Sequence, residues 1–210
     1  MKLTEMQVGA YLDTMASDAP APGGGSASAL CGAQGAGLVT MVAGLTVGSK
    51  KYAAHRERCT EILHQGLPYV AELKAQVDRD TDAFNLVSAA FKMPKETEEE
   101  RQRRSQAIQE GTLASTQAPL ETMRLSLAAL QNAQRLLEGF NKSAASDLGV
   151  AALDLLSAVR GAWLNVLINI GSLKDQEKAQ AFRQEGEAIL HEAEGLADRI
   201  YAEALRMIAQ

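Results

Sequence analysis

The chain has 210 residues, of which 46% are hydrophobic, 22% charged and only 4% aromatic. This composition is typical of one globular domain, residues 1–210, with a core built from Ala, Leu, Val and Met. The formal net charge of −5 argues against nucleic acid as the main partner, because phosphate binding requires a basic surface.

Cysteine usage and hydropathy point to an intracellular setting. Cys31 and Cys59 are isolated from each other, and neither belongs to a C-x-x-C motif. The sequence shows no secretory signal and no basic amphipathic segment. We therefore expect a cytoplasmic protein without a membrane partner.

The first predicted helix covers residues 3–16, with Thr4 and Gln7 as a possible capping box. The stretch 20–25, which reads PAPGGG, ends this helix with two prolines and a glycine turn. Ser26 is then a favoured N-cap for the next helix.

The helix predicted from Ser26 to about Gly48 carries no charge, and small residues recur in it at every fourth position: Ser28, Gly32, Ala36, Thr40, Gly44 and Gly48. Residues four apart share a helix face, so another backbone or a flat ligand can approach closely. The run is long enough to span a bilayer, but its prolines, glycines and few large apolar residues favour a buried central helix. The glycine turn before it is a candidate ligand cradle, since a helix N-terminus can hold an anion on its backbone amides.

Helical patterns continue through the rest of the chain, at about 52–66, 68–91, 97–138, 147–170 and 174–208. Pro68 is placed in the first turn of its helix, where proline is tolerated, and Pro119 is expected to kink or divide the helix 97–138. Thr97 and Glu100 form a capping box. Because no segment alternates like a strand, the sequence predicts an all-α bundle of about six long helices, kinked at prolines, in a single domain.

The helix 68–91 carries an acidic residue on an apolar stripe. The stripe steps by three and four residues through Val70, Leu73, Val77, Asp80, Phe84, Val87 and Phe91. Asp78 and Asp82 lie about 200° away from it and can stay hydrated. A carboxylate on the packed face loses water, which raises its pKa and suits a general acid or base near neutral pH. The alternative is a core aspartate paired with a lysine, an arginine or a backbone amide.

A second polar set lies on the helix 147–170, where Asp147, Asp154, Gly161, Asn165 and Ile168 follow helical spacing and Asn169 is one turn beyond Asn165. Buried amides and carboxylates need partners. They can bond to a neighbouring helix, or they can recognise a polar heteroaromatic ligand.

Other kinds of site find little support. The histidines are scattered, so we expect no metal site. The glycine turn lacks the G-K-[ST] of a P-loop, and Ser26 lacks a G-x-S-x-G context. Four lysines could serve a carboxylated ligand: Lys50, Lys51, Lys92 and Lys95.

Four stretches together resemble the cyclodeaminase/cyclohydrolase family of one-carbon folate enzymes: PAPGGGSASALCGAQGAGLVTMVAGLT, VDRDTDAFNLVSAAFKMPKETEEE, SAASDLGVAAL and GAWLNVLINI. This is the family of the C-terminal domain of formiminotransferase-cyclodeaminase and of stand-alone methenyltetrahydrofolate cyclohydrolases. The likeness covers nearly the whole chain in the same order, and the combination of P-G-G-G-S with D-x-x-A-F is specific.

The resemblance implies an all-helical homodimer that acts, without a metal, on a tetrahydrofolate derivative that can be polyglutamylated. Asp80 of D-x-x-A-F would be the catalytic acid/base. The substrate-binding positions implied by the matching motifs are Gly23, Gly24, Gly25, Ser26, Phe84, Lys92, Lys95, Asp147, Asn165 and Asn169. Lys51 stands where many relatives carry a more arginine-rich stretch, at the expected contact with the glutamate tail.

Two reactions fit this resemblance. A formimidoyltetrahydrofolate cyclodeaminase, slightly preferred here, closes 5,10-methenyltetrahydrofolate and releases ammonia. A methenyltetrahydrofolate cyclohydrolase adds water to the same carbon and gives 10-formyltetrahydrofolate. Outside catalysis, a helical dimer that associates through its small-residue face, or a folate-binding module, remains the alternative.

Overall fold

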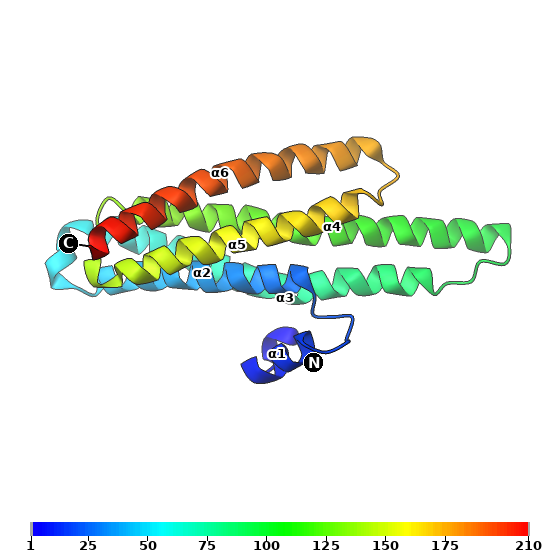
Figure 1. Ribbon diagram of the computed structural model, residues 1–210, viewed down its shortest axis with the longest axis horizontal. Helices are drawn as coiled ribbons and strands as arrows, with labels where there is room; N and C mark the ends of the chain where they lie inside the picture. Colours follow the sequence, from blue (N-terminus) through cyan, green and yellow to red (C-terminus); the bar gives the residue numbers. More distant parts are fainter. Residues whose placement is uncertain (1, 210) are drawn as a thin grey trace.

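The computed structural model describes residues 2–209, and all of the regular structure in this range is helical (Figure 1). The α-helices are α1 (Val8–Met15), α2 (Gly24–Val47), α3 (Arg56–Phe91), α4 (Glu98–Leu136), α5 (Ala145–Ile170) and α6 (Gln176–Ile208). Three 3-10 turns lie between or before them, at Leu3–Glu5, Lys50–His55 and Lys142–Ala144. The all-α prediction is therefore confirmed, although α1 is much shorter than the other five helices.

The five long helices run roughly along one axis, and α2 lies beside α3 on the lower side of the bundle (Figure 1). Helix α2 packs against α3, α4 and α5, while α6 covers α5 and α4. Helices α3 and α4 form a hairpin that extends past the first residues of α2 (Figure 1). This overhang leaves the start of α2 open on one side, where α3 and α4 continue without it.

The small residues of α2 allow its neighbours to approach closely. A Cβ added at Gly32 would lie 2.9 Å from Ser126 Oγ and 3.0 Å from a Leu73 methyl group, and one at Gly35 would lie 2.7 Å from Leu155 Cγ. Helices α2 and α5 are long and apolar enough to span a membrane by composition. In this fold 44% of the apolar window of α2 and 50% of that of α5 are buried against neighbouring helices, and a helix that packs in a core needs the same composition.

Two predicted N-caps are wrong because the side chains have other partners. Helix α2 begins one turn earlier than expected, with Gly23 as its N-cap, and the Ser26 hydroxyl instead donates across to the Val77 carbonyl of α3 at 2.8 Å. Residues 3–16 are divided into a 3-10 turn and α1, and the Thr4 hydroxyl donates to Asp78 at 2.7 Å. The capping box of Thr97 and Glu100 is confirmed at the start of α4.

Neither internal proline divides its helix. Pro68 lies inside α3 rather than at the start of a new helix. A helical proline leaves the carbonyl four residues earlier without its N–H donor; here this carbonyl belongs to His64, and both residues are exposed to water. Pro119 lies inside the continuous helix α4, and the carbonyl that it frees has a partner in the candidate site.

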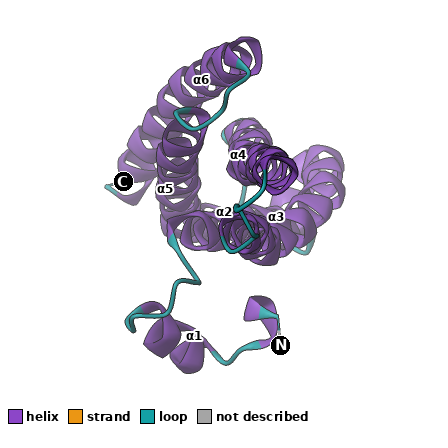
Figure 2. Ribbon diagram, turned by 90° about the vertical axis from the view of Figure 1, so that its right-hand side faces the viewer, coloured by secondary structure: helices purple, strands orange, loops and turns teal. Residues whose placement is uncertain are grey.

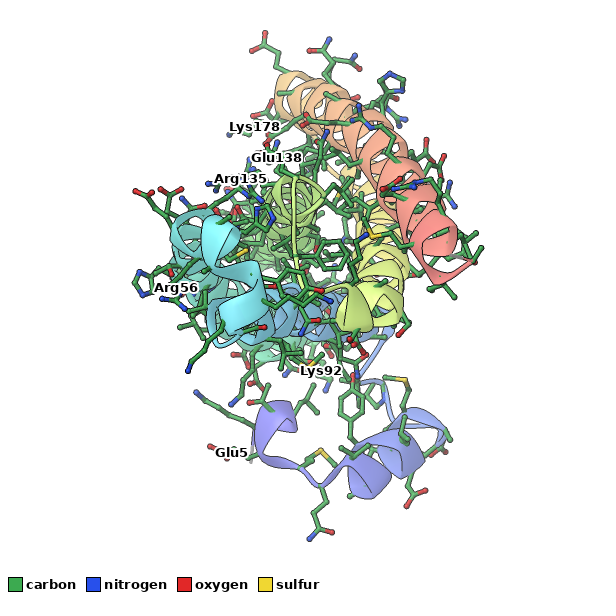
Figure 3. The ribbon with its side chains drawn as sticks, turned by 90° about the vertical axis from the view of Figure 1, so that its left-hand side faces the viewer. Glu5, Arg56, Lys92, Arg135, Glu138 and Lys178 are labelled. Atoms are coloured by element: carbon green, nitrogen blue, oxygen red, sulfur yellow. The ribbon has the colours of Figure 1, made fainter. Side chains whose placement is uncertain are left out.

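The N-terminal arm, residues 2–15, lies on the outside of the bundle, below α2 and α3 in Figure 2. Glu5, labelled in Figure 3, marks its position in a second view. Tyr11 is the buried side chain of α1 and packs with Ala29 of α2 and Val77 of α3. The arm thus rests on the seam between α2 and α3.

Candidate active site

A cleft of 390 Å³ opens where α2 begins, and four helices and the glycine turn contribute to its walls. The lining residues are Pro20, Ala21, Gly23, Gly24, Gly25, Asp80, Thr81, Phe84, Val87, Ser115, Asn165, Ile168, Asn169 and Ser172. The structure therefore brings together the glycine turn, Asp80, Phe84 and both asparagines, which lie far apart in the sequence.

The cleft exists because α3 continues past the start of α2. Leu73 and Val77 of the apolar stripe are fully buried, but Phe84 and Phe91 are 42% and 57% exposed. The stripe was predicted to face the core over its whole length, and this is wrong beyond Asp80, since α2 no longer covers α3 there. Asp80 lies at the last covered position, and Phe84 lines the opening.

Gly25 makes room for the Asp80 carboxylate. A Cβ built on Gly25 would overlap all three atoms of the carboxyl group. Asp80 therefore approaches the backbone of the first turn of α2, where unpaired N–H groups and the helix dipole favour a negative charge. The cradle formed by the glycine turn holds this carboxylate of the protein itself.

Ser26 connects the seam to Asp80 and Thr81. Its Oγ lies 2.8 Å from the Val77 carbonyl, 3.3 Å from Asp80 Oδ2 and 3.1 Å from Thr81 Oγ1. A hydroxyl has one proton to donate, so the nearby carbonyl and carboxylate share a single donor. Ser26 therefore positions the Asp80 carboxylate, but its shared hydrogen bond stabilises the negative charge only weakly.

Burial raises the pKa of Asp80 above its ordinary value, and the hydrogen bonds from the Ser26 side chain and backbone only partly offset this effect. Desolvation penalises the charged form, whereas hydrogen bonds to the charged form favour it. No lysine or arginine of the described chain makes an ion pair with Asp80. A carboxyl group whose pKa is raised in this way keeps its proton to higher pH than an exposed aspartate, as a residue that accepts and returns a proton requires.

Asp78 has a structural partner, although the sequence predicted a hydrated surface position. Its Oδ1 accepts from the Leu3 backbone N–H at 2.6 Å, and its Oδ2 accepts from the Thr4 hydroxyl. Asp78 thus attaches the N-terminal arm to α3, two residues before Asp80. Asp82 is exposed, as expected.

The two asparagines of α5 face the cleft from the other side. Asn165 Nδ2 donates to the Gly161 carbonyl at 2.9 Å, and Asn169 Nδ2 donates to the Ser115 carbonyl at 2.6 Å. Ser115 stands four residues before Pro119, so its carbonyl is the one that the proline leaves without a helical donor. Among residues 2–209 no donor bonds to either Oδ1, which leaves both oxygens available to a ligand.

Sequence reasoning did not single out Thr81, Ser115 or Ser172. The Ser115 hydroxyl is buried and has no partner among the described residues. Its position before Pro119 was the one available signal, because a free carbonyl was to be expected there. Thr81 and Ser172 carry no pattern that distinguishes them from other surface residues.

Five expected site residues do not line the cleft: Ser26 is fully buried beside Asp80, so its substrate-binding prediction is not met, and the other four lie away from the cleft. Asp147 is in the first turn of α5, 18 residues or about 27 Å along the helix from Asn165. Lys51 lies next to Tyr52 in the 3-10 turn after α2, with its Nζ 5.5 Å from the ring centroid. Lys92 is exposed just after α3, and Lys95 lines a separate groove. Within one chain, none of these four residues reaches Asp80.

A larger hollow of 540 Å³ runs along α3 and α4. Its arginines already have carboxylate partners: Arg79 bonds to Glu72 at 2.9 Å and Arg124 to Glu185 at 2.6 Å. The cleft at Asp80 is the better candidate because it combines a desolvated carboxylate with oxygens of Ser115, Asn165 and Asn169 that are unpaired within the described part of the chain. No group of three His, Cys, Asp or Glu side chains suited to a metal ion occurs in residues 2–209.

The family model described as formiminotransferase-cyclodeaminase matches residues 7–188, which include every lining residue of the cleft. The chain belongs to this family. Membership agrees with the resemblance read from the sequence, and it covers the glycine turn, Asp80 and the asparagines in one continuous match.

Individual relatives carry two different names. The chain is 38% identical to a methenyltetrahydrofolate cyclohydrolase of Methylorubrum extorquens over 91% of its own length and 92% of that protein. It is 34% identical to the formimidoyltransferase-cyclodeaminase of Rattus norvegicus, of which it spans 35%. The crystal structure of a formiminotetrahydrofolate cyclodeaminase from Thermotoga maritima superposes with a TM-score of 0.79 at 25% identity, covering 98% of this chain and 97% of that one.

Proposed function

We propose that the cleft binds a tetrahydrofolate that carries a one-carbon unit, and that Asp80 is the acid/base at that carbon. One observation carries the proposal: a desolvated carboxylate lies against Gly25 at the start of α2, inside a cleft. Family membership supports the substrate class, because relatives of both names act on a folate.

The first candidate reaction is hydrolysis of 5,10-methenyltetrahydrofolate. Water attacks the cationic amidinium carbon, Asp80 accepts the proton that the water loses, and the new C–O bond gives a tetrahedral intermediate. N5 then takes the proton held by Asp80, the bond from this carbon to N5 breaks, and the hydroxyl of the intermediate releases its proton to solvent as the C=O bond of 10-formyltetrahydrofolate forms. The charged form of Asp80 also stabilises the cationic carbon before attack. The full-length match to a cyclohydrolase at 38% identity favours this reaction.

The second candidate reaction is cyclodeamination of 5-formimidoyltetrahydrofolate. N10 attacks the carbon of the protonated formimidoyl group, Asp80 takes the N10 proton, and the same carboxyl returns it to the nitrogen, which leaves as ammonia as the cationic 5,10-methenyl bridge forms. The similarity to the Thermotoga maritima cyclodeaminase over nearly the whole chain favours this reaction. Both reactions require one acid/base at one carbon, so the same cleft geometry serves either.

The asparagines and Phe84 would hold the pterin part of the folate. A pterin presents N–H donors along its edge, and the free Oδ1 atoms of Asn165 and Asn169 are acceptors at the cleft wall. Phe84 offers an apolar face to the ring system. With the pterin held in this way, its one-carbon unit would lie next to Asp80, where the carboxylate contacts Gly25.

A homodimer is the proposed assembly. Large apolar side chains on the outward faces of α2 and α5 are 41–73% exposed: Met41, Leu45, Val150, Leu153, Leu164 and Ile168. These two helices pack together, so the residues belong to one surface, and monomers rarely expose large apolar patches. Sedimentation at micromolar concentration should give twice the chain mass, and the Leu164→Glu variant should sediment as a monomer.

The test measures both reactions with one protein preparation. Methenyltetrahydrofolate absorbance follows its hydrolysis or its formation, and a coupled ammonia assay follows deamination. Asp80→Asn should lower kcat by about 10²–10⁴-fold and leave the helical circular dichroism unchanged, with Asp82→Asn as the matched control. Turnover of the Asp80→Asn variant at the wild-type rate would overturn the assignment. Folate binding without turnover would identify a binding module instead.

A further inference from the structure

A second hollow, here called the basic groove, lies between the first half of α4 and the connection from α5 to α6. It has a volume of 360 Å³ and is lined by Lys95, Arg101, Arg104, Ser105, Ile108, Gln109 and Lys174. Four of these residues are cationic and none is acidic, in a chain of net charge −5. Such a lining attracts a negatively charged ligand.

Most of the positive charge in the basic groove is not neutralised. Arg101 bonds to Glu98 at 2.8 Å, but Lys95, Arg104 and Lys174 make no ion pair with any of the residues 2–209. Lys174 Nζ donates to the neutral Ser105 hydroxyl at 2.7 Å. Most other arginines of the chain pair with glutamate, so Arg104 stands out.

The Arg104 guanidinium is held in place while most of its donors stay free. Its Cζ lies 5.4 Å from the centroid of the Phe91 ring, and one Nη donates to the Phe91 carbonyl at 3.2 Å. The Nε atom is buried and has no partner in the described chain. A guanidinium has five N–H donors in a fork that matches a carboxylate. A carboxylate in the basic groove would supply the missing acceptors.

The basic groove and the cleft share a wall. Gln109 accepts from the Lys174 backbone N–H at 2.8 Å and donates to the Ser172 carbonyl at 3.1 Å. Ser172 lines the cleft, whereas Lys174 and Gln109 line the groove. Along α4, Arg104 lies 11 residues, or about 16 Å, from Ser115 of the cleft. An elongated ligand can therefore reach from one to the other.

We propose that the basic groove binds the glutamate carboxylates of the folate whose pterin lies in the cleft, with Arg104 and Lys174 as the residues that hold them. This inference rests on the proposed function. In a folate the p-aminobenzoyl group separates the pterin from the glutamate, so one molecule needs a polar cleft and a cationic site at a distance. Arg104 would form paired hydrogen bonds with one carboxylate, and Lys174 would add a mobile charge.

The kinetic test compares two substrates that differ only in the glutamate: 5,10-methenyltetrahydrofolate and 5,10-methenyltetrahydropteroate. Arg104→Gln should raise KM for the folate about tenfold, corresponding to about 1.4 kcal/mol, while kcat stays within twofold. The same variant should leave kcat/KM for the pteroate unchanged. Lys174→Gln, at an exposed position, should raise KM for the folate in the same direction.

Arg199→Gln is the matched control, because Arg199 also makes no ion pair among residues 2–209 and lines a different hollow on α6. Titration calorimetry with 5-formyltetrahydrofolate gives a second readout that does not need turnover. Weaker binding to Arg104→Gln and Lys174→Gln, but not to Arg199→Gln, supports the groove even if neither reaction is catalysed. Equal dissociation constants for all three variants and the wild type would overturn this inference and leave the role of Asp80 untouched.

Discussion

The two ends of the α2–α5 pair differ in how completely they are packed. At the end where α2 stops, the exposed fractions of Val39, Val42 and Leu148 are at most 1%. The buried Thr46 hydroxyl there donates to the Val42 carbonyl and accepts from the Asn141 N–H. At the end where α2 starts, the same two helices enclose a cleft with free amide oxygens and the desolvated Asp80.

Ion pairs also distinguish the two ends. At the packed end, Arg135 of α4 bonds to Glu61 of α3, and Glu138, two residues after α4 ends, bonds to Arg58 of α3; Arg135 and Glu138 are labelled in Figure 3. Asp80 at the open end has no such partner in the described chain. Buried polar atoms without a partner among residues 2–209 occur at both ends, since Arg58 Nε and Asn132 Nδ2 lie at the packed end, but at the open end they lie next to a cleft and a desolvated carboxylate. The comparison assigns stability to the packed end and chemistry to the open end.

Apart from replacement of Asp80 itself, the largest expected effect on kcat comes from Gly25→Ala. The new Cβ would occupy the position of the Asp80 carboxyl group, so the carboxylate must move, and a displacement of about 1 Å can cost about 100-fold in kcat. Steady-state assays of both folate reactions provide the measurement. Gly195→Ala is the control, since a Cβ there meets nothing within 4 Å. An unchanged kcat in Gly25→Ala would show that catalysis does not depend on the close contact between Gly25 and the Asp80 carboxyl group.

At the packed end, Leu148→Ala should lower the stability of the fold and leave kcat almost unchanged, the opposite of the effect expected from Gly25→Ala. Leu148 has no exposed surface, and truncation of a fully buried leucine costs about 3 kcal/mol in the free energy of unfolding. Urea denaturation should show this loss, while kcat of the folded variant stays within twofold. A large loss of kcat with unchanged stability would contradict the division between the two ends.

A smaller effect is expected from Ser26→Ala. Its hydrogen bond lowers the pKa of Asp80, against the larger effect of burial. Without this donor the pKa of Asp80 should rise further, so the acidic limb of the kcat/KM profile should move to higher pH. Ser28→Ala is a suitable comparison, because the Ser28 hydroxyl bonds within its own helix to the Gly24 carbonyl. A shift to lower pH in Ser26→Ala would be the wrong sign.

The smallest expected effect concerns stability. Because folding raises the pKa of Asp80, the folded state holds the proton more tightly than the unfolded state. This stabilisation is complete below the unfolded-state pKa and is lost as pH rises through the folded-state pKa. Asn cannot ionise, so the Tm of Asp80→Asn relative to wild type should increase across that window. A relative Tm that falls with rising pH would contradict a desolvated Asp80.

Periodicity predicted much of this molecule, because helices bury apolar stripes of fixed spacing. It located Asp80 on the packed side of α3 and placed Asn165 and Asn169 on one side of α5. It failed at Pro68, where solvent compensates the free carbonyl, and at Ser26, whose partner is on another helix. The overlap of Gly25 with Asp80 and the bond from Asn169 to the Ser115 carbonyl join distant segments, so local patterns contain no signal for them.

The most direct test is a carbon-13 NMR titration of the Asp80 carboxyl group, with Asp80→Asn used to assign its resonance. We predict a midpoint above the ordinary value of 3.8, because the loss of water at the α2–α3 seam outweighs the hydrogen bonds from Ser26. A midpoint at or below 3.8 would show a well-solvated or strongly stabilised carboxylate. That result would contradict its assignment as the acid/base of the cleft.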